Sequence, residues 1–309
     1  MSIKSWKGAL FALGLGFGVC AALPSNVRAE EQKLVQTVEN RLHPDSTALP
    51  RRAEYGYVSD DANAVIARLL SYETDAERKE MRRQFYLNSV WYRQDAQYVD
   101  ENGKPYLLVY EGAASDRRKL SYELLAGLPF FSNAKVLITT KGDKLIAAVE
   151  LGRPFTEAEA YRNYRNLLRL QGLTEEVKAQ TAGKTPREKA QFICDTVAKR
   201  LNYDYSLQQN CLQDVVVSQR TACVGYNGLT ELLFRSVGLS YVNMIANNRE
   251  TGVMHIFGTS KIDGNWLIFD TSNYDNESGP LDASYIFSEL EHEAKGYRDF
   301  KLLQGERLN

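Results

Sequence analysis

The feature that most constrains the fold is a two-residue turn, Asp263-Gly264, between two runs of strand-forming residues. Val253–Ile262 precedes the turn and Asn265–Asp270 follows it. An Asp-Gly pair between such runs is typical of a tight antiparallel hairpin, because both residues tolerate a positive φ. A two-residue loop also fixes the register, so we expect Ile262 to face Asn265.

The register brings two ionisable side chains together. Counting back from the turn puts Phe257 opposite Asp270 and His255 opposite Ser272. Paired residues and those two positions along share a face, so His255 and Asp270 are expected to be diagonal neighbours within side-chain reach. We therefore predict a hydrogen bond between this imidazole and this carboxylate. Taken singly, a histidine in a strand is more often a hydrogen-bonded core residue, and Asp270 would be a turn former at a strand end.

A cysteine stands at the predicted start of an apolar helix that precedes these strands. After Cys223 the apolar residues recur at spacings of three and four, and Gly238 ends the run. At a helix start, unpaired backbone N–H groups and the positive end of the helix dipole favour thiolate over thiol. Cys223 is therefore a candidate nucleophile, with a small buried core cysteine as the alternative.

Another helix start is predicted upstream, at Thr185-Pro186-Arg187-Glu188. It combines a capping Thr, a Pro at the first helical position and a Glu three residues after the cap. We expect this helix to run to about Leu201, with Cys194 near its apolar side. A loop is expected from Asn202 to Arg220, and a strand from Tyr241 to Ala246.

The region from residue 30 to 152 predicts a mixed helical and β-hairpin unit, so the whole chain is expected to be α+β. After Pro154 a further helix is expected, ending at Gly172. The elements predicted before it are a helical, charge-rich stretch from Glu31 to Gln94, a short strand at Tyr106–Tyr110, and a hairpin of Val136–Thr140 with Leu145–Leu151.

The first 29 residues resemble a secretory signal peptide. Lys4 and Lys7 precede an apolar run from Gly8 to Leu23, and Val27-Arg28-Ala29 supplies the small-residue cleavage pattern. We therefore expect a secreted or extracytoplasmic protein, in the periplasm or cell envelope, with no transmembrane segment after cleavage. An uncleaved anchor and a lipoprotein modified at Cys20 are the alternatives.

Composition excludes several other classes of protein. Lys and Arg number 38 against 39 for Asp and Glu, so no overall positive charge favours nucleic-acid binding. Three widely spaced histidines and no Cys-x-x-Cys motif predict no metal centre, and we expect no cofactor. An acidic stretch with Asp275, Glu277 and Asp282 could bind calcium, but solvated surface is the simpler interpretation.

The C-terminal half thus carries a cysteine at a helix start, a histidine in a later strand, and an aspartate ending the next strand. The sequences around them are Thr221-Ala222-Cys223-Val224-Gly225-Tyr226, His255, and Asp263-Gly264-Asn265-Trp266 leading into Phe269-Asp270-Thr271. Together they resemble the transglutaminase-like superfamily, over roughly Pro186 to Asp275. Asn202-Tyr203-Asp204 also resembles a segment that these domains often carry.

The resemblance implies a papain-like core, with a Cys-bearing helix packed on an antiparallel sheet that bears His and Asp. It implies Cys223 as nucleophile, His255 as general base and acid, and Asp270 as the orienting carboxylate. The catalytic domain would be 153–309, after a signal peptide (1–29) and an N-terminal unit of unknown role (30–152). Asn227 and Ile256-Phe257 depart from the family pattern, which puts the substrate surface in doubt.

Two further assignments depend on this interpretation. The Cys223 N–H would be one oxyanion donor, and Gln219 is a candidate for the second. Cys194 and Cys211 would form a disulfide in an exported protein and leave Cys223 free, with two reduced buried cysteines as the alternative.

The predicted function is thiol-dependent acyl transfer on a protein or peptide amide through a Cys223 thioester. Water as acceptor gives a peptidase or amidase, and an amine gives a cross-linking transglutaminase; we favour hydrolysis because nothing in the sequence excludes water. The alternative is a non-catalytic, transglutaminase-like binding or scaffold module of the cell envelope.

Overall fold

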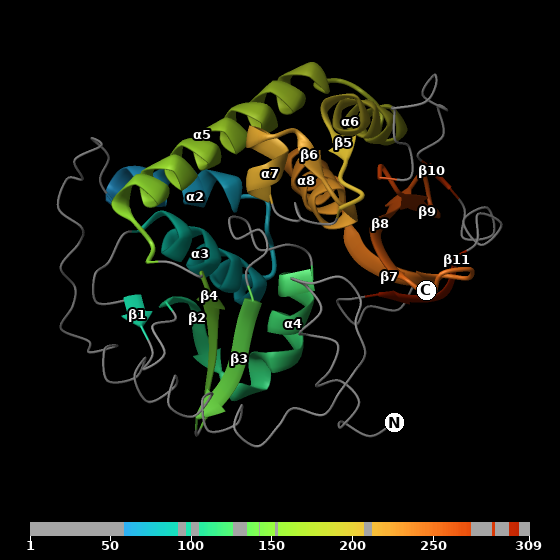
Figure 1. Cartoon of the computed structure of the whole chain (residues 1–309). Coiled ribbons are helices and arrows are strands. Elements are labelled where there is room, and N and C mark those ends of the chain that lie inside the picture. Colours follow the sequence, from blue (N-terminus) through green and yellow to red (C-terminus); the bar gives the residue numbers. More distant parts are fainter. Residues whose placement is uncertain are drawn as a thin grey trace. The chain divides into compact units, whose positions relative to one another are not determined.

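The computed structural model describes residues 59–91, 97–99, 105–125, 135–141, 143–151, 154–206, 212–272, 286–287 and 297–302 (Figure 1). Helices and strands both contribute substantially, so the fold is α+β. The described residues form two compact units. The first takes those within Met1–Leu70, Asp75–Ser121 and Pro129–Leu168, and the second those within Ser71–Thr74, Tyr122–Leu128 and Arg169–Asn309.

This division falls inside a helix, and the boundary predicted between residues 152 and 153 stays a prediction. The predicted signal peptide, with Cys20, lies outside the described residues.

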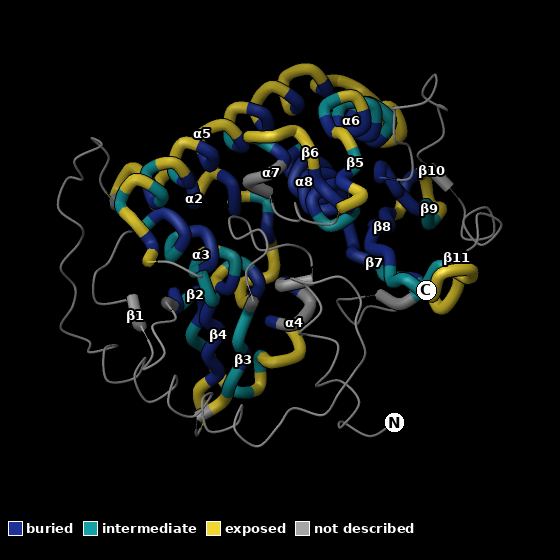
Figure 2. Tube along the Cα trace, viewed as in Figure 1, coloured by how far each residue is buried: buried dark blue, intermediate teal, exposed yellow. Residues whose placement is uncertain are grey.

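The first unit contains an antiparallel sheet in the order β1-β2-β4-β3. Strand β4 is buried along nearly its whole length (Figure 2). The predicted hairpin is confirmed, with small shifts at the strand ends. The elements are α2 (Ser59–Leu69), α3 (Ala76–Val90), β1 (Gln97–Val99), β2 (Pro105–Ala113), η4 (Ala114–Asp116), α4 (Arg117–Leu125), β3 (Lys135–Lys141), β4 (Lys144–Glu150) and the first part of α5 (Glu157–Gln180).

Side chains of α3 bind the edge of β2 beyond the short strand β1, which pairs only with residues 105–107. Gln84 donates from Nε2 to the carbonyl of Glu111 at 3.2 Å and accepts at Oε1 from the Glu111 N–H at 3.0 Å. Asn88 donates to the carbonyl of Val109 at 2.9 Å. These amides occupy backbone groups that another strand would otherwise pair with, which protects the edge.

Helix α5 continues to Gln180, so the prediction that it ends at Gly172 is wrong. Leu170, Leu173 and Val177 are buried at spacings of three and four and extend the apolar stripe past the glycine. Burial of this stripe outweighs the helix penalty of one glycine, about 0.5–1 kcal/mol. The turn that follows the helix contains Gly183, at a φ of 76°.

The second unit contains an antiparallel sheet in the order β10-β9-β8-β7-β11 and several helices (Figure 1). The segment expected to be a loop from Asn202 to Arg220 contains two short strands and a helix. The elements are the remainder of α5, α6 (Pro186–Arg200), β5 (Asn202–Tyr203), α7 (Leu212–Val217), β6 (Arg220–Thr221), α8 (Cys223–Ser236), β7 (Val242–Asn248), β8 (Met254–Ile262), β9 (Asn265–Phe269), β10 (Ile286–Phe287) and β11 (Tyr297–Leu302).

Two local predictions about this unit are confirmed. Thr185 and Glu188 form the predicted reciprocal capping box at the start of α6. At the β8–β9 turn, Asp263 has a φ of 52° and Gly264 a φ of 84°, as a type I′ turn requires. Ile262 faces Asn265 in the predicted register.

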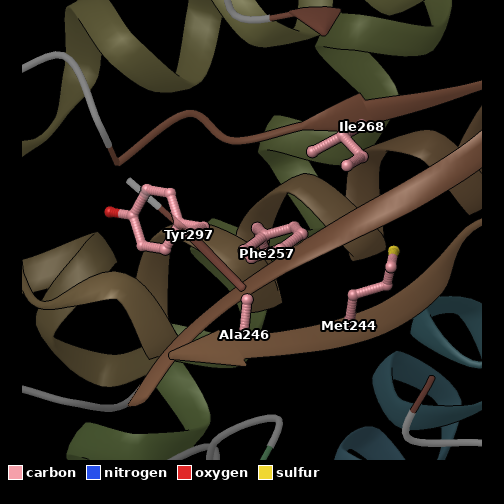
Figure 3. Packing of buried hydrophobic residues seen from close by; sticks show 5 residues of the cluster. All are labelled: Met244, Ala246, Phe257, Ile268 and Tyr297. Atoms are coloured by element: carbon pink, nitrogen blue, oxygen red, sulfur yellow. The ribbon is translucent and has the colours of Figure 1, made fainter. Parts of the chain in front are cut away.

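Buried residues pack on the five-stranded sheet in two clusters. On the face covered by α8, the ring of Phe234 packs against Tyr241 and Phe269, with centroids 5.1 and 4.7 Å apart. A Cβ at Gly258 would overlap the Tyr241 ring, so a side chain is excluded there. Five buried residues form a second cluster (Figure 3): Met244, Ala246, Phe257, Ile268 and Tyr297.

We predict opposite effects for two glycine-to-alanine substitutions. Gly258→Ala should destabilise the protein by roughly 1–3 kcal/mol, because the added methyl overlaps the buried Tyr241 ring. Gly172→Ala, the control, should stabilise it by roughly 0.5–1 kcal/mol, because this exposed helical position has open space around it. Urea unfolding measures both. Equal stability of the two variants would contradict the packing described for Gly258.

Candidate active site

Cys223 is the first residue of α8 and is half-buried. Its thiol hydrogen-bonds to the side chain of His255 and to the backbone N–H of Ile256. The preceding residue, Ala222, has extended backbone and no side chain that caps the helix. The sulfur therefore lies at a helix start, beside an imidazole.

His255 and Asp270 lie on one face of the sheet and are hydrogen-bonded, as the register predicts. The Nε2 atom of His255 is 2.8 Å from Oδ2 of Asp270, and the Asp270 side chain is fully buried. Ser272 donates to Oδ1 of Asp270 at 2.9 Å, so both carboxylate oxygens are engaged. Because Asp270 occupies Nε2, Nδ1 is the ring nitrogen left for Cys223.

A buried pair of threonines ties the residue after Asp270 to the helix that carries Cys223. Thr230 of α8 donates to the carbonyl of Tyr226 at 2.8 Å, and its Oγ1 lies 3.0 Å from Oγ1 of Thr271. Since the Thr230 proton goes to Tyr226, Thr271 is the donor in this second bond. The contact fixes the end of β9 against α8, and so the carboxylate relative to the sulfur.

The electrostatics of the site favour a thiolate–imidazolium pair. Burial raises the pKa of the Cys223 thiol, but the hydrogen bond and charge of His255 and the N–H of Ile256 outweigh this, so its pKa lies below the ordinary value. Burial lowers the pKa of His255, but the charge and hydrogen bond of Asp270, with the contact to Cys223, raise it to about 10. Between these two pKa values both groups are charged.

Tyr203 is a further residue at the site, one that the sequence reasoning did not assign. Its hydroxyl hydrogen-bonds to the Cys223 side chain and accepts the Cys223 backbone N–H. Burial, with the charges of Cys223 and Asp270, raises the pKa of Tyr203 above its ordinary value, so the hydroxyl keeps its proton. The only signal in the sequence was the Asn202-Tyr203-Asp204 segment, whose pairing with a later strand could not be deduced.

That pairing is what holds Tyr203 in place. β5 and β6 are parallel, with Tyr203 opposite Thr221, and the Asp204 N–H donates to the Thr221 carbonyl at 2.9 Å. Thr221 is fully buried against the first turn of α8, where a side chain at position 225 would overlap it. Gly225 therefore allows β6, the strand that pairs with Tyr203, to approach the helix of Cys223.

Two other predicted residues, Gln219 and Cys194, lie within the described part of the chain. Gln219 is exposed at a φ of 54°, and its carbonyl accepts the Asn202 N–H at 2.8 Å. Cys194 is a free thiol, fully buried on the inner side of α6, which differs from the predicted disulfide. Its partner in that prediction, Cys211, lies outside the described residues, as do Asp275, Glu277 and Asp282 of the acidic stretch.

Asn227 does not belong to a substrate surface, which corrects the doubt raised by the sequence. Its side chain is buried, donates to Asn243 at 2.7 Å and accepts from the Tyr241 hydroxyl at 3.0 Å. Asn243 donates to Glu231 at 3.1 Å, and Arg235 donates to the same carboxylate at 3.0 Å. Asn227 is therefore part of a buried polar network that links α8 to β7.

Within the described ranges, no group of three or more His, Cys, Asp or Glu side chains could hold a metal ion. None of the helices described is both long enough and apolar enough to cross a membrane.

Comparisons with known proteins give partial similarities. No protein-family model and no curated protein matches the chain. A structure described as a TGase (transglutaminase) is 15% identical, with a TM-score of 0.30, over 62% of this chain and 64% of that one. A candidate cysteine protease from Cytophaga hutchinsonii is 11% identical, with a TM-score of 0.30, over 64% of this chain and 78% of that one. A candidate protease from Parabacteroides distasonis ATCC 8503 is 11% identical, with a TM-score of 0.23, over 50% and 41%.

We predict that iodoacetamide alkylates Cys223 at a rate that stays flat well below the free-thiol pKa of about 8.5. The pKa of Cys223 is lowered, so the rate should fall at a lower pH than the rate of a free thiol does, as the thiolate takes up a proton. Mass spectrometry of the labelled peptides measures this, and Cys194, buried and with a raised pKa, serves as the internal control that stays unlabelled. His255→Ala should abolish the plateau; an unchanged profile in that variant would contradict the ion pair.

Proposed function

We propose that this protein is an exported, thiol-dependent acyl-transfer enzyme of transglutaminase-like, papain-like type, acting on protein or peptide amides. One observation carries the proposal: a cysteine at a helix start hydrogen-bonds to an imidazole whose Nε2 is held by a buried carboxylate at 2.8 Å. This arrangement supplies a nucleophile, a proton carrier and an orienting group. The export signal predicted at residues 1–29 supports a site of action outside the cytoplasm.

In the proposed acylation step, the Cys223 thiolate attacks the carbonyl carbon of the substrate amide. A C–S bond forms, and the π electron pair of the carbonyl moves to its oxygen. When this tetrahedral intermediate collapses, the C–N bond breaks, and the imidazolium of His255 gives its Nδ1 proton to the leaving amine. Asp270 keeps the ring in the orientation that directs Nδ1 to Cys223.

In the second step, water or an amine attacks the thioester while neutral His255 takes the proton of this nucleophile. The new C–O or C–N bond forms as the C–S bond breaks, and the thiolate–imidazolium pair returns. Water gives hydrolysis and a primary amine gives cross-linking. We retain hydrolysis as the preferred outcome, because water is always present as an acceptor.

The Cys223 N–H and the Tyr203 hydroxyl are the proposed oxyanion donors. In the free protein the two groups bond to each other, so they converge on one position beside the sulfur. A substrate carbonyl oxygen placed between them would displace this contact and accept from both. The pairing of β5 with β6 positions the hydroxyl before substrate arrives, which is the condition for strong stabilisation of developing charge.

Cys223→Ala should lower turnover of p-nitrophenyl acetate and of susceptible peptide amides by at least ~10⁴-fold, because no thioester can form. Mass spectrometry of quenched reactions should find the acyl group on Cys223 of the unmodified protein. Cys194→Ala, which removes the other described thiol, is the control and should keep turnover. Wild-type protein that forms no acyl adduct, or equal turnover in Cys223→Ala, would favour the non-catalytic binding module.

Tyr203→Phe should slow acylation of Cys223 by p-nitrophenyl acetate by about 10²–10³-fold, while iodoacetamide alkylation stays near the wild-type rate. Acylation develops an oxyanion and alkylation does not, so the two rates separate the roles of the hydroxyl. Tyr205→Phe is the matched control, since Tyr205 packs on Tyr203 at 5.0 Å but is largely exposed. Equal loss of both rates would mean that Tyr203 positions the thiol; a gain in both would mean that it blocks the site.

A further inference from the structure

The last described strand, β11, brings an aromatic ring to the proposed site. The ring of Tyr297, the first residue of β11, stacks on the imidazole of His255, with centroids 5.0 Å apart and planes 27° apart. Tyr297 is also buried and packs edge-on against Phe257 at 6.3 Å. Figure 3 shows the rings of Tyr297 and Phe257 beside each other, with Ala246 on the neighbouring strand.

The sheet register explains how a residue so far along the chain reaches His255. On β7, Ala246 pairs with His255 of β8, and Asn248 pairs with Tyr297 of β11. Positions 246 and 248 share a face, so His255 and Tyr297 share it too, two strand spacings apart. The side chain of Ala246 is only a methyl group, which leaves room for the Tyr297 ring to extend across β7 to the imidazole.

We propose that Tyr297 is a positioning residue that acts through His255: its ring stabilises the imidazolium and holds it in the plane that keeps Nε2 on Asp270. The inference rests on the proposed function for its relevance to acyl transfer. The face of an aromatic ring carries partial negative charge and attracts a cation stacked on it, most strongly where water is excluded. The Tyr297 ring covers one side of an imidazole that is almost fully buried.

The groups that act on His255 come from several elements. Asp270 at the end of β9 and Cys223 of α8 favour its charged form, while burial opposes it. The Oγ atom of Ser272 lies 3.5 Å from Nε2, and the Tyr203 side chain of β5 hydrogen-bonds to Cys223. Replacing Tyr297 must therefore remove the ring without admitting water, since hydration alone would favour the charged form. Leucine, which stays apolar and fills much of the space, meets this condition better than alanine.

The test is the pKa of His255, measured by NMR titration of ¹⁵N-labelled imidazoles in the full chain, which contains only three histidines. Tyr297→Leu should lower this pKa by about one unit, on the order of a tenfold change in the protonation equilibrium. The pH range over which the rate of iodoacetamide labelling at Cys223 is flat should become narrower at both ends. The imidazolium loses its proton at a lower pH, and a less stable imidazolium also stabilises the thiolate less. Tyr297→Phe keeps the ring and should keep the wild-type pKa and plateau.

Phe300→Leu is the matched control. Phe300 belongs to the same strand and packs on Phe257 at 6.1 Å, so its loss removes an aromatic ring from the same cluster without removing the ring stacked on His255. This variant should leave the His255 pKa unchanged. Unfolding by urea checks that the variants compared remain folded at the pH values used.

The outcomes separate this inference from the proposed function. A His255 pKa that is lowered in Tyr297→Leu but not in Tyr297→Phe or Phe300→Leu supports the positioning role. This holds even if the wild-type protein transfers no acyl group. A His255 pKa that is the same in Tyr297→Leu and wild type overturns the inference and reduces Tyr297 to core packing. An equal shift in Tyr297→Phe also overturns it, because the hydroxyl rather than the ring would then be responsible.

Discussion

The position of the proposed site depends on the register of one hairpin. The turn at Asp263-Gly264 has a positive φ at both residues and aligns β8 with β9, so that His255 and Asp270 fall on the same face. A slip of one residue would put them on opposite faces and break their 2.8 Å hydrogen bond. The same face then receives Tyr297 from the edge strand β11, because β7 pairs with β8 on one side and with β11 on the other. A local turn preference thus determines which side chains can meet around the imidazole.

Two groups of buried charges in the unit that contains this hairpin are compensated by neighbouring groups. The Asp270 carboxylate, withdrawn from solvent, is bound by His255 and Ser272, and it supports the imidazolium that in turn lowers the pKa of Cys223. Removing one member would leave a buried charge uncompensated, which is far more destabilising than losing an exposed ion pair. A second network, of Asn227, Asn243, Glu231 and Arg235, ties the middle of α8 to β7. Together these contacts fix the helix whose first residue carries the sulfur.

Features that depend on neighbouring residues could be predicted from the sequence. The β8–β9 turn, the α6 capping box and the shared face of His255 and Asp270 each follow from a few adjacent positions. Contacts between distant segments could not. Tyr203 reaches Cys223 through a two-residue parallel pairing, and Tyr297 reaches His255 through a strand added to the edge of the sheet. No turn motif in the sequence predicts either pairing. The continuation of α5 past Gly172 was missed because burial of a stripe, not local propensity, decides it.

The central claim is that a carboxylate, through an imidazole, ionises the cysteine at the start of α8. Thiolate absorbs in the ultraviolet more strongly than thiol, so the difference between wild type and Cys223→Ala reports the charge on this sulfur as pH varies. The decisive comparison is this difference with and without Asp270→Asn, which keeps the shape of residue 270 but removes its charge. We expect thiolate well below a pH of about 8.5 with Asp270, and a titration shifted upward toward that value with Asn. Identical titrations, or no thiolate below that pH in wild type, would contradict the account.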